Sequence, residues 1–303
     1  MSADDVVIDV DLARRLLSQQ FPDWAALPIT EIASGWDNVT YRLGDDLSIR
    51  LPRYPRWVGQ VEREHRWLPK LAPHLPLTVS SPLGHGVPGE GYPFPWSVYR
   101  WLDGENAELG KLTDPQQAAR DLAGFITALQ RIDATGGPGP EWSNGFRGVP
   151  MGDPRDSIAI EDRVRPKIAA LVGGYDVGVV TAVWEASLKA PAWDRDPVWL
   201  HGDLAPGNLL MKDGRLSAII DFGTLAVGDP ACDLQVAWTF LTDATREAFR
   251  EAVAVDEATW VRGRGWGLAC CLPTHDDFGD ESRLAERLAR VDEIVADFRK
   301  SGS

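Results

Sequence analysis

The stretch His201-Gly-Asp-Leu-Ala-Pro-Gly-Asn-Leu-Leu210, followed by Ile219-Ile-Asp-Phe-Gly223, is the part of the chain that decides its fold. Each segment places polar residues directly after a short apolar run. In the first segment Asn208 follows Asp203 by five residues, and the second segment carries Asp221. Because short apolar runs of this kind form buried strands, we expect the ends of two neighbouring strands to bring these three side chains together.

The residue types and their spacing are those that phosphoryl transfer requires. In that reaction a protein orients the acceptor, aligns the triphosphate and neutralises the developing charge through metal ions. Asp203 is the candidate catalytic base for a hydroxyl acceptor. Asn208 and Asp221 are candidate ligands of Mg²⁺, which favours a few protein oxygens completed by water and phosphate. A single Asp at a strand end is usually a cap or turn residue, so the prediction depends on the joint pattern, with His201 in a supporting role.

The composition is that of an ordinary globular protein. The 303 residues are 44% hydrophobic and 25% charged, and a chain of this length is expected to form two lobes or domains. No apolar run reaches the roughly 18–20 residues that a membrane span requires. The acidic start lacks the basic region of a signal peptide, and three cysteines are too few for a disulfide framework. We therefore expect a cytoplasmic protein with no membrane partner.

The net charge of −14 argues against nucleic acid as a partner, because its phosphates would be repelled. An acidic surface of this kind attracts cationic ligands. General solubility explains the same charge equally well, so the charge alone does not identify a ligand.

The hydrophobic pattern divides the chain into two parts. We predict an α+β, bilobal protein-kinase-like fold with a small N-terminal antiparallel β-sheet lobe carrying one helix (1–99), a hinge at 97–104, and a larger mainly helical C-terminal lobe (100–303). The patterns behind this prediction are a helix at 9–20, strands at 29–33, 39–43 and 47–51, a helix at 58–72, a strand at 96–102, helices at 115–132, 160–173, 177–190, 231–242, 243–254, 256–271 and 281–300, and strands at 198–200 and 218–220 joined through the Asp213-Gly214 turn.

The chain resembles the aminoglycoside phosphotransferase family, which shares the bilobal protein-kinase-like fold. The resemblance covers roughly residues 25–300 and is most specific at 198–238, which includes Gly228-Asp-Pro-Ala-Cys-Asp-Leu234. It implies that Asp203 is the catalytic base, that Asn208 and Asp221 bind magnesium, and that ATP or GTP is the phosphate donor.

Two features separate the chain from protein kinases. Only seven residues lie between Gly223 and Ala231, which is too short for an activation segment that supports a peptide. Ala205 stands where protein kinases that phosphorylate Ser and Thr carry a phosphate-contacting lysine. We therefore expect a small-molecule acceptor.

A cation for the triphosphate is expected on the strand at 47–51. Arg50 occupies the position that the family pattern gives to a lysine, and arginine keeps the charge while contacting phosphate differently. Glu64 on the following helix is the expected partner acid, with Glu62 as the alternative. Arg50 and Glu64 could instead form ordinary surface pairs.

Other nucleotide contacts are expected from backbone groups and small side chains. Ser34, Gly35 and Asn38 lie in the turn between the first two strands, where N–H groups and a hydroxyl can face phosphate. Backbone groups near Arg100 and Leu102, in the hinge, are positioned to bind the edge of a purine.

An acidic loop before the last helix is the candidate acceptor site. It carries Asp276, Asp277, Asp280 and Glu281, and acids near the C-terminus often bind cationic sugars in the resembled family. We interpret the loop as a cation-recognition site for a positively charged acceptor. The alternative is a solvated helix N-terminus, where acids are expected from the helix dipole.

These observations predict a Mg²⁺-dependent small-molecule O-phosphotransferase. It would move the γ-phosphate of ATP or GTP to a hydroxyl of an antibiotic, either an aminoglycoside or a related sugar-containing compound. A metabolic kinase for a sugar, a polyol or a choline-like amine is the first alternative. A catalytically silent nucleotide-binding protein is the second, and the complete set of Asp203, Asn208 and Asp221 argues against it.

Overall fold

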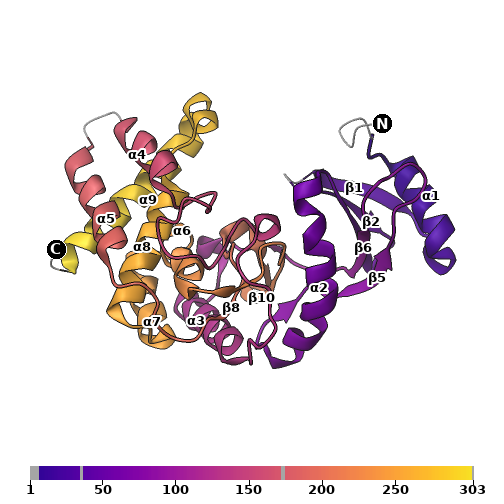
Figure 1. Cartoon of the computed structure of the whole chain (residues 1–303), viewed down its shortest axis with the longest axis horizontal. Helices are drawn as coiled ribbons and strands as arrows, with labels where there is room; N and C mark the ends of the chain where they lie inside the picture. The colour runs from indigo at the N-terminus through magenta and orange to yellow at the C-terminus, as the bar shows by residue number, and fades with distance from the viewer. Residues whose placement is uncertain (1–6, 35–36, 172–174, 302–303) are drawn as a thin grey trace.

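The chain folds into a β-rich part and a helical part that lie side by side (Figure 1). The structure is a computed structural model that describes residues 7–34, 37–171 and 175–301. Within these ranges, no helix combines the length and the apolar character that a bilayer span requires.

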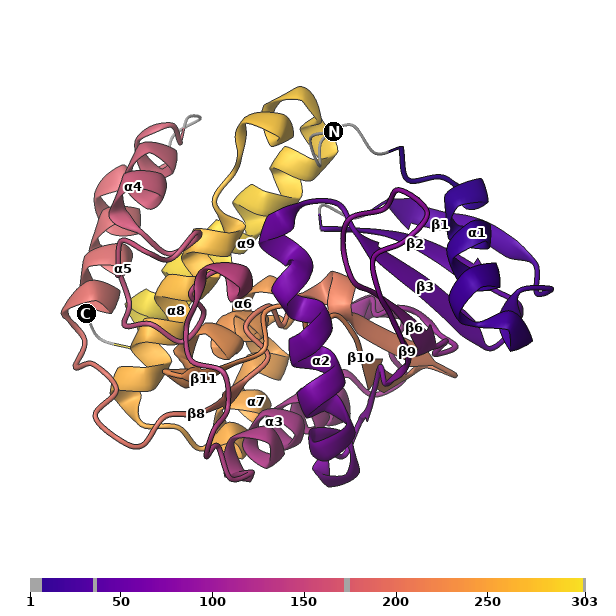
Figure 2. The same ribbon diagram turned by 45° about the vertical axis from the view of Figure 1, so that its right-hand side comes forward.

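The β-rich part is built on a five-stranded antiparallel sheet with the strand order β1-β2-β3-β6-β5. Apolar residues of helix α1, among them Leu12 and Leu16, are buried in the same core as the inner residues of β2 and β3. Helix α2 lies between the sheet and the helical part in both views (Figures 1 and 2). The elements are α1 (Val10–Gln20), β1 (Ile29–Ser34), β2 (Asn38–Leu43), β3 (Leu47–Pro52), α2 (Val58–Leu71), β5 (Pro82–Gly86) and β6 (Trp96–Arg100).

A second sheet carries the motif segments. Its order is β4 (Thr78–Val79), β10 (Arg215–Ile219), β9 (Leu209–Lys212) and β7 (Glu105–Asn106). Asp213 and Gly214 have φ angles of +53° and +72°, which suit the two-residue turn between β9 and β10. The turn thus joins β10 to β9, which the sequence analysis did not predict as a strand. The predicted strand at 198–200 instead pairs with another short strand: β8 (Val198–Leu200) with β11 (Ala226–Gly228).

Helices make up most of the remaining chain. They are α3 (Pro115–Arg131), α4 (Glu161–Ala169), α5 (Val177–Lys189), α6 (Val236–Thr239), α7 (Asp243–Val253), α8 (Glu257–Cys271) and α9 (Glu281–Lys300). The prediction of one helix at 231–242 was wrong: a 3₁₀ segment, η8 (Pro230–Gln235), precedes the short α6. Asp229 caps η8 by accepting a hydrogen bond from Ala231 N, and every residue of η8 is buried. The predicted antiparallel sheet lobe and helical remainder are confirmed, with α1 as a second helix packed on the sheet.

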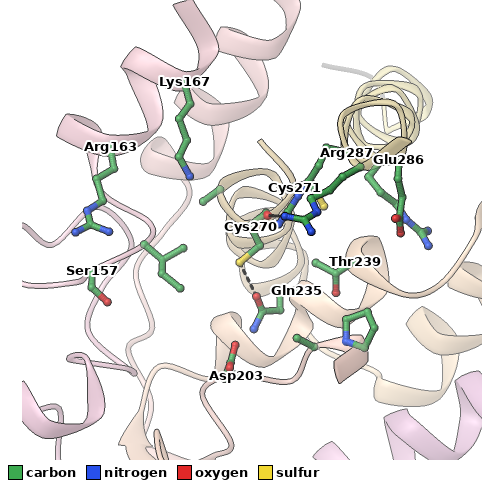
Figure 3. Close-up of a pocket in the computed structure, with 16 residues that line it drawn as sticks. Ser157, Arg163, Lys167, Asp203, Gln235, Thr239, Cys270, Cys271, Glu286 and Arg287 are labelled. Atoms are coloured by element: carbon green, nitrogen blue, oxygen red, sulfur yellow. Dashed lines mark hydrogen bonds between the residues drawn. The ribbon is translucent and has the colours of Figure 1, made fainter. Parts of the chain in front are cut away.

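Helix α8 is the centre of the helical part and is buried on nearly all sides. Its glycines permit close approach of neighbouring segments. A Cβ atom at Gly265 would lie 2.5 Å from Ser187 Cβ of α5, and one at Gly263 would lie 2.6 Å from Leu234 Cβ of η8. The C-terminal end of α8 then meets α4 and α9 around a cavity that Asp203 also lines (Figure 3).

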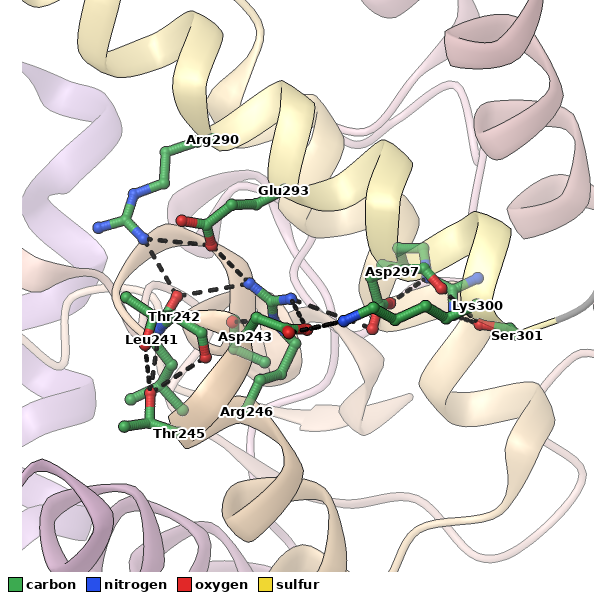
Figure 4. A network of polar contacts seen from close by, with 12 residues as sticks. Leu241, Thr242, Asp243, Thr245, Arg246, Arg290, Glu293, Asp297, Lys300 and Ser301 are labelled. Carbon is green, nitrogen blue, oxygen red and sulfur yellow. Dashed lines mark hydrogen bonds and ion pairs between the residues drawn. The ribbon is translucent and has the colours of Figure 1, made fainter.

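Helix α9 is fastened to the helical part by buried arginines (Figure 4). Arg246 of α7 donates to Ala237 O and to Glu293 Oε2 of α9, both at 2.8 Å. Arg264 of α8 donates to Asp297 Oδ2 of α9 at 2.8 Å. Because both arginines are buried, these bonds fix where α9 lies.

We expect Arg246→Ala to lower the free energy of unfolding by about 2 kcal/mol, since it leaves Ala237 O and Glu293 without their donor in a largely desolvated site. Urea unfolding of the purified chain measures the change. Lys300→Ala is the control: Lys300 pairs with Asp243, both more than 60% exposed, so its loss should cost less than about 0.5 kcal/mol. Equal effects of the two substitutions would show that α9 does not depend on Arg246.

Candidate active site

The loop between β8 and β9 brings Asp203 and Asn208 together. Asn208 Nδ2 donates to Asp203 O at 2.8 Å and to Asp203 Oδ2 at 3.3 Å. Since the amide nitrogen is engaged in this way, the amide oxygen of Asn208 is left as a potential ligand. Ile220 N donates to Asn208 O at 3.0 Å, which docks the end of β10 on the loop beside Asp221.

The start of this loop is held by a buried carboxylate. His201 N and Gly202 N donate to the two oxygens of Asp233 at 2.8 and 2.7 Å. Sequence reasoning gave Asp233 no role, although it lies in the segment 228–234 that carries the family resemblance most specifically. The motif in that segment is the sequence signal from which a role for Asp233 could have been predicted.

A second anchor comes from a buried ion pair. Arg147 Nε donates to Gly202 O at 2.8 Å, and its Nη1 lies 3.1 Å from Asp156 Oδ2. Both residues lie in the region 133–160, where Gly and Pro dominate and no periodic pattern marked them in the sequence. Together with Asp233, this pair fixes the backbone immediately before Asp203.

The environments of Asp203 and Asp221 push their pKa values in opposite directions. Burial raises the pKa of Asp203, although His201 and Arg147 oppose the change. Burial would also raise the pKa of Asp221, but Arg50 outweighs it and holds the pKa below its ordinary value. Asp203 is therefore the better proton acceptor, while Asp221 is the firmly ionised carboxylate.

Asp221 also has a strained backbone. Its φ angle of +65° lies in the left-handed region, which residues other than glycine seldom adopt. Such strain persists where the surrounding structure imposes it and is common at functional sites. Here it accompanies the 3.0 Å contact from Arg50 Nη2 to Asp221 Oδ1.

A cavity of about 450 Å³ between the two parts of the chain is lined by Arg50, Asn208 and Asp221. Arg50 is its central cation, 3.0 Å from Asp221 and 3.8 Å from Glu64. Glu64 is fully buried and accepts a hydrogen bond from Tyr99. The structure therefore brings Arg50 and Glu64 together in the interior.

The alternative acid on α2 lies elsewhere. Glu62 contacts His85, with Oε1 2.9 Å from Nε2, and is exposed. Asp37 is the acid that sequence reasoning missed: it lines the same cavity, 3.5 Å from Arg50. The segment 33–38 was interpreted as a source of phosphate-binding donors, so a carboxylate was not expected there.

Two of the predicted nucleotide contacts in the turn can be described. Asn38 is buried, accepts from Gln60 Nε2 at 2.8 Å and donates to Asp37 Oδ2 at 2.6 Å. It therefore fixes Asp37. Ser34 is the last residue of β1, and Gly35 lies outside the described residues.

The hinge follows β6 and lines the same cavity with Arg100 and Leu102. Arg100 N donates to Ser81 O and Trp101 N donates to Asp46 O, so these groups are occupied. Within the described ranges, the backbone N–H and C=O of Leu102 make no hydrogen bond. Leu102 is therefore a hinge residue in the lining of this cavity whose backbone is available to a base.

A separate cavity of about 500 Å³ lies on the other side of the loop, where Asp203 lines it (Figure 3). Its walls come from α4, α8, α9 and the segment around α6. The charged side chains in its lining are Arg163, Lys167, Arg283, Arg287, Arg290, Glu286 and Asp203. The four acids of the predicted cation-recognition loop are not among the described residues that line it.

Two acids of that loop cap helices. Asp277 is buried and accepts from Thr274 N at 2.7 Å and from Thr274 Oγ1 at 2.8 Å. Asp280 accepts from the first backbone N–H groups of α9. Asp276 and Glu281 are exposed. This geometry favours the alternative of a helix N-terminus, and the cation-recognition role stays a prediction.

Comparison with known proteins identifies relatives by sequence. The sequence model described as "Phosphotransferase enzyme family" matches residues 28–266. An aminoglycoside 3'-phosphotransferase from Escherichia coli is 38% identical over 61 residues, which are 20% of this chain and 22% of that protein. The aligned stretch thus spans about a fifth of that relative's length.

Solved structures share the whole fold. The GDP and kanamycin complex of APH(2")-IIIa has a TM-score of 0.67 at 18% identity, covering 94% of this chain and 98% of that one. The macrolide 2'-phosphotransferase MphH from Brachybacterium faecium has a TM-score of 0.57 at 22% identity, covering 94% and 97%. These similarities confirm the kinase-like fold. Because the family model covers most of the chain, the protein belongs to the phosphotransferase enzyme family, as the resemblance predicted.

Proposed function

We propose that the protein is a Mg²⁺-dependent small-molecule O-phosphotransferase that moves the γ-phosphate of ATP or GTP to a hydroxyl of a sugar-containing compound. One observation carries the proposal. The loop 203–208 separates two cavities, with Asp203 facing one and Asn208 facing the other. An acceptor and a nucleotide bound in these cavities would meet at the loop.

The chemistry is a single displacement. The acceptor oxygen attacks the γ-phosphorus, the bond from that phosphorus to the β-phosphate oxygen breaks, and the nucleoside diphosphate leaves. The Asp203 carboxylate orients the hydroxyl and takes its proton. The raised pKa of Asp203 suits this role, and the anchors at Asp233 and Arg147 hold the carboxylate in place.

The residues present fit a magnesium ion. Asp221 is ionised, and the amide oxygen of Asn208 is left free by the contacts of its nitrogen. Among the described residues there is no group of three or more His, Cys, Asp or Glu that could hold a metal. A sparse set completed by water and phosphate is what Mg²⁺ favours. When bound, the ion neutralises charge that develops on the phosphate oxygens.

The nucleotide is proposed to lie in the cavity between the lobes (1–99 and 100–303, hinge 97–104). Arg50, held by Glu64, would contact phosphate, and the backbone of Leu102 would contact the base. Ser34, Gly35, Asn38 and Arg100 remain proposed neighbours of the nucleotide. The neighbour that was solved in complex with GDP and kanamycin supports a nucleotide co-substrate.

An antibiotic is one candidate acceptor, supported by the neighbours named for kanamycin and for macrolides. A metabolic kinase is the second candidate, and the basic lining of the acceptor cavity favours it over an aminoglycoside kinase. The net charge of −14 disfavours a nucleic acid partner. The expected cytoplasmic location stays a prediction.

The proposed function is tested by incubating the protein with Mg²⁺, ATP or GTP and a panel of antibiotics and sugars. Mass spectrometry detects the phosphate added to an acceptor.

Asp203→Asn is expected to lower kcat by about 10²–10⁴-fold, because the amide keeps the shape of the side chain but cannot take the proton. Nucleotide affinity should change little, since Asp203 lines the other cavity. Phosphate transfer and nucleotide binding are measured in parallel. Asp213→Asn, an equal change of charge in an exposed turn, is the control. A fully active Asp203→Asn enzyme would refute the assigned mechanism.

Asp233→Asn tests the anchoring of the loop. An amide can accept only one of the two hydrogen bonds from His201 N and Gly202 N, so we expect about 1–3 kcal/mol lower stability and a reduced kcat with KM for nucleotide little changed. Amide hydrogen exchange at Gly202 should become faster, which a distant structural effect would not produce. Asp196→Asn, at an exposed position, is the matched control. Unchanged exchange at Gly202 would contradict the anchoring role.

A further inference from the structure

The lining of the cavity beside Asp203 is rich in cations, although the whole chain is acidic. The net charge of the protein is −14. Five cationic side chains line the cavity, against two carboxylates: Asp203 itself and the exposed Glu286. Concentrated positive charge in a concave site attracts anions even when the net charge is negative, because distant surface charges are screened.

The cations face the cavity from two sides (Figure 3). Arg163 and Lys167 come from α4, with the Lys167 side chain reaching into the cavity. Arg287 comes from α9 and reaches toward Cys270, whose backbone oxygen accepts a hydrogen bond from it. A ligand in the cavity would therefore have cations on both sides.

The cations of α9 are fixed by protein partners, and the carboxylates of Asp280, Asp277 and Glu293 also balance their charge. Arg287 Nε lies 3.6 Å from Asp277 Oδ2, and Arg290 Nη1 donates to Leu241 O at 3.0 Å. Arg283 Nε lies 3.9 Å from Asp280 Oδ2. Asp277 and Asp280, which the sequence analysis assigned to recognition of a cationic acceptor, thus hold arginine side chains at the cavity.

The cations of α4 lack such partners. Within the described ranges, the side chains of Lys167 and Arg163 make no hydrogen bond or ion pair. Burial lowers the pKa of Lys167, and repulsion from Arg287 and Arg163 adds to this, while Cys270 and Asp277 oppose the change. A partly buried cation held beside other cations is costly unless an anion compensates it.

We propose that the acceptor carries an anionic group, a carboxylate or a phosphate, which binds between Lys167 and Arg287 while a hydroxyl of the same molecule lies at Asp203. This rests on the proposed kinase function. A cavity of about 500 Å³ fits a compact molecule such as a sugar acid or a sugar phosphate. Polycationic aminoglycosides are disfavoured, because their ammonium groups would face these cations.

The test compares sugars of one ring size and different charge. Glucuronate, glucose 6-phosphate, glucose and glucosamine are titrated into the full chain with Mg²⁺ and ADP, and affinity is read by ligand-observed NMR. We expect at least one anionic sugar to bind about tenfold more tightly than glucose, and glucosamine to bind most weakly. The two anionic arms distinguish a carboxylate site from a phosphate site. The proposal is overturned if neither anionic sugar binds more tightly than glucose.

Lys167→Met assigns the effect to the cavity. It should reduce the affinity for the preferred anionic sugar about tenfold and leave glucose unchanged. Arg165→Met removes the same charge from the same helix, where Arg165 faces Glu161 and Glu185 instead of the cavity, and should change neither. Equal effects of the two variants would also overturn the proposal.

Phosphate transfer is scored separately with ATP or GTP. If an anionic sugar binds more tightly than glucose but no phosphate is transferred to any acceptor, the proposed kinase function is contradicted and the anion site is retained. Transfer that favours glucosamine, with intact nucleotide binding, would contradict the anion site and keep the kinase function.

Discussion

The rest of the site depends on the buried carboxylate of Asp233, which receives the backbone N–H groups of His201 and Gly202. The same 3₁₀ segment is tied to α8 by the ion pair between Asp229 and Arg262, at 2.9 Å. Helix α8 is in turn locked by close packing at its glycines. The position of the loop that carries Asp203 is thus set by the centre of the helical core, which gives the pre-organisation that positioning-based catalysis needs.

In the cavity between the lobes, a second set of contacts, centred on Arg50, joins the two parts of the chain. Arg50 from the sheet contacts Asp221 from the helical part, with Asp37 and Glu64 close by. Burial and the charge of Asp221 raise the pKa of Asp37. Burial raises the pKa of Glu64 as well, so the negative charge of this cluster is smaller than its three carboxylates suggest, but Arg50 is the single guanidinium set among them. A triphosphate would be repelled there unless further cations entered with it, which is consistent with a nucleotide that binds as its magnesium complex.

The sequence predicted the features that depend on local patterns. Asp203 and Asp221 were predicted from the apolar strands that precede them, and Asn208 from its distance of five residues to Asp203; their catalytic and metal-binding roles stay predictions. The 3₁₀ segment at 230–235 was predicted as a helix, because its form depends on backbone groups some thirty residues earlier that Asp233 binds. The acids at 276–281 stood out by local density, but density does not show where side chains point. The lining of the cavity beside Asp203 could not be predicted, because most of its charged residues come from α4 and α9, which are more than a hundred residues apart in the sequence.

The charge of that cavity also limits what the family relationship implies. A shared fold does not fix the acceptor, because the acceptor is selected by the particular side chains of the site. Here Asp277 accepts hydrogen bonds from Thr274 in a capping box and lies 3.6 Å from Arg287, and these contacts would compete with a ligand's ammonium group. Lys167 has a stem long enough to reach the cavity, and its ammonium group makes no ion pair or hydrogen bond among the described residues. An unpaired, partly buried cation is stabilised when an anion binds beside it, and we propose that this anion belongs to the molecule whose hydroxyl lies at Asp203.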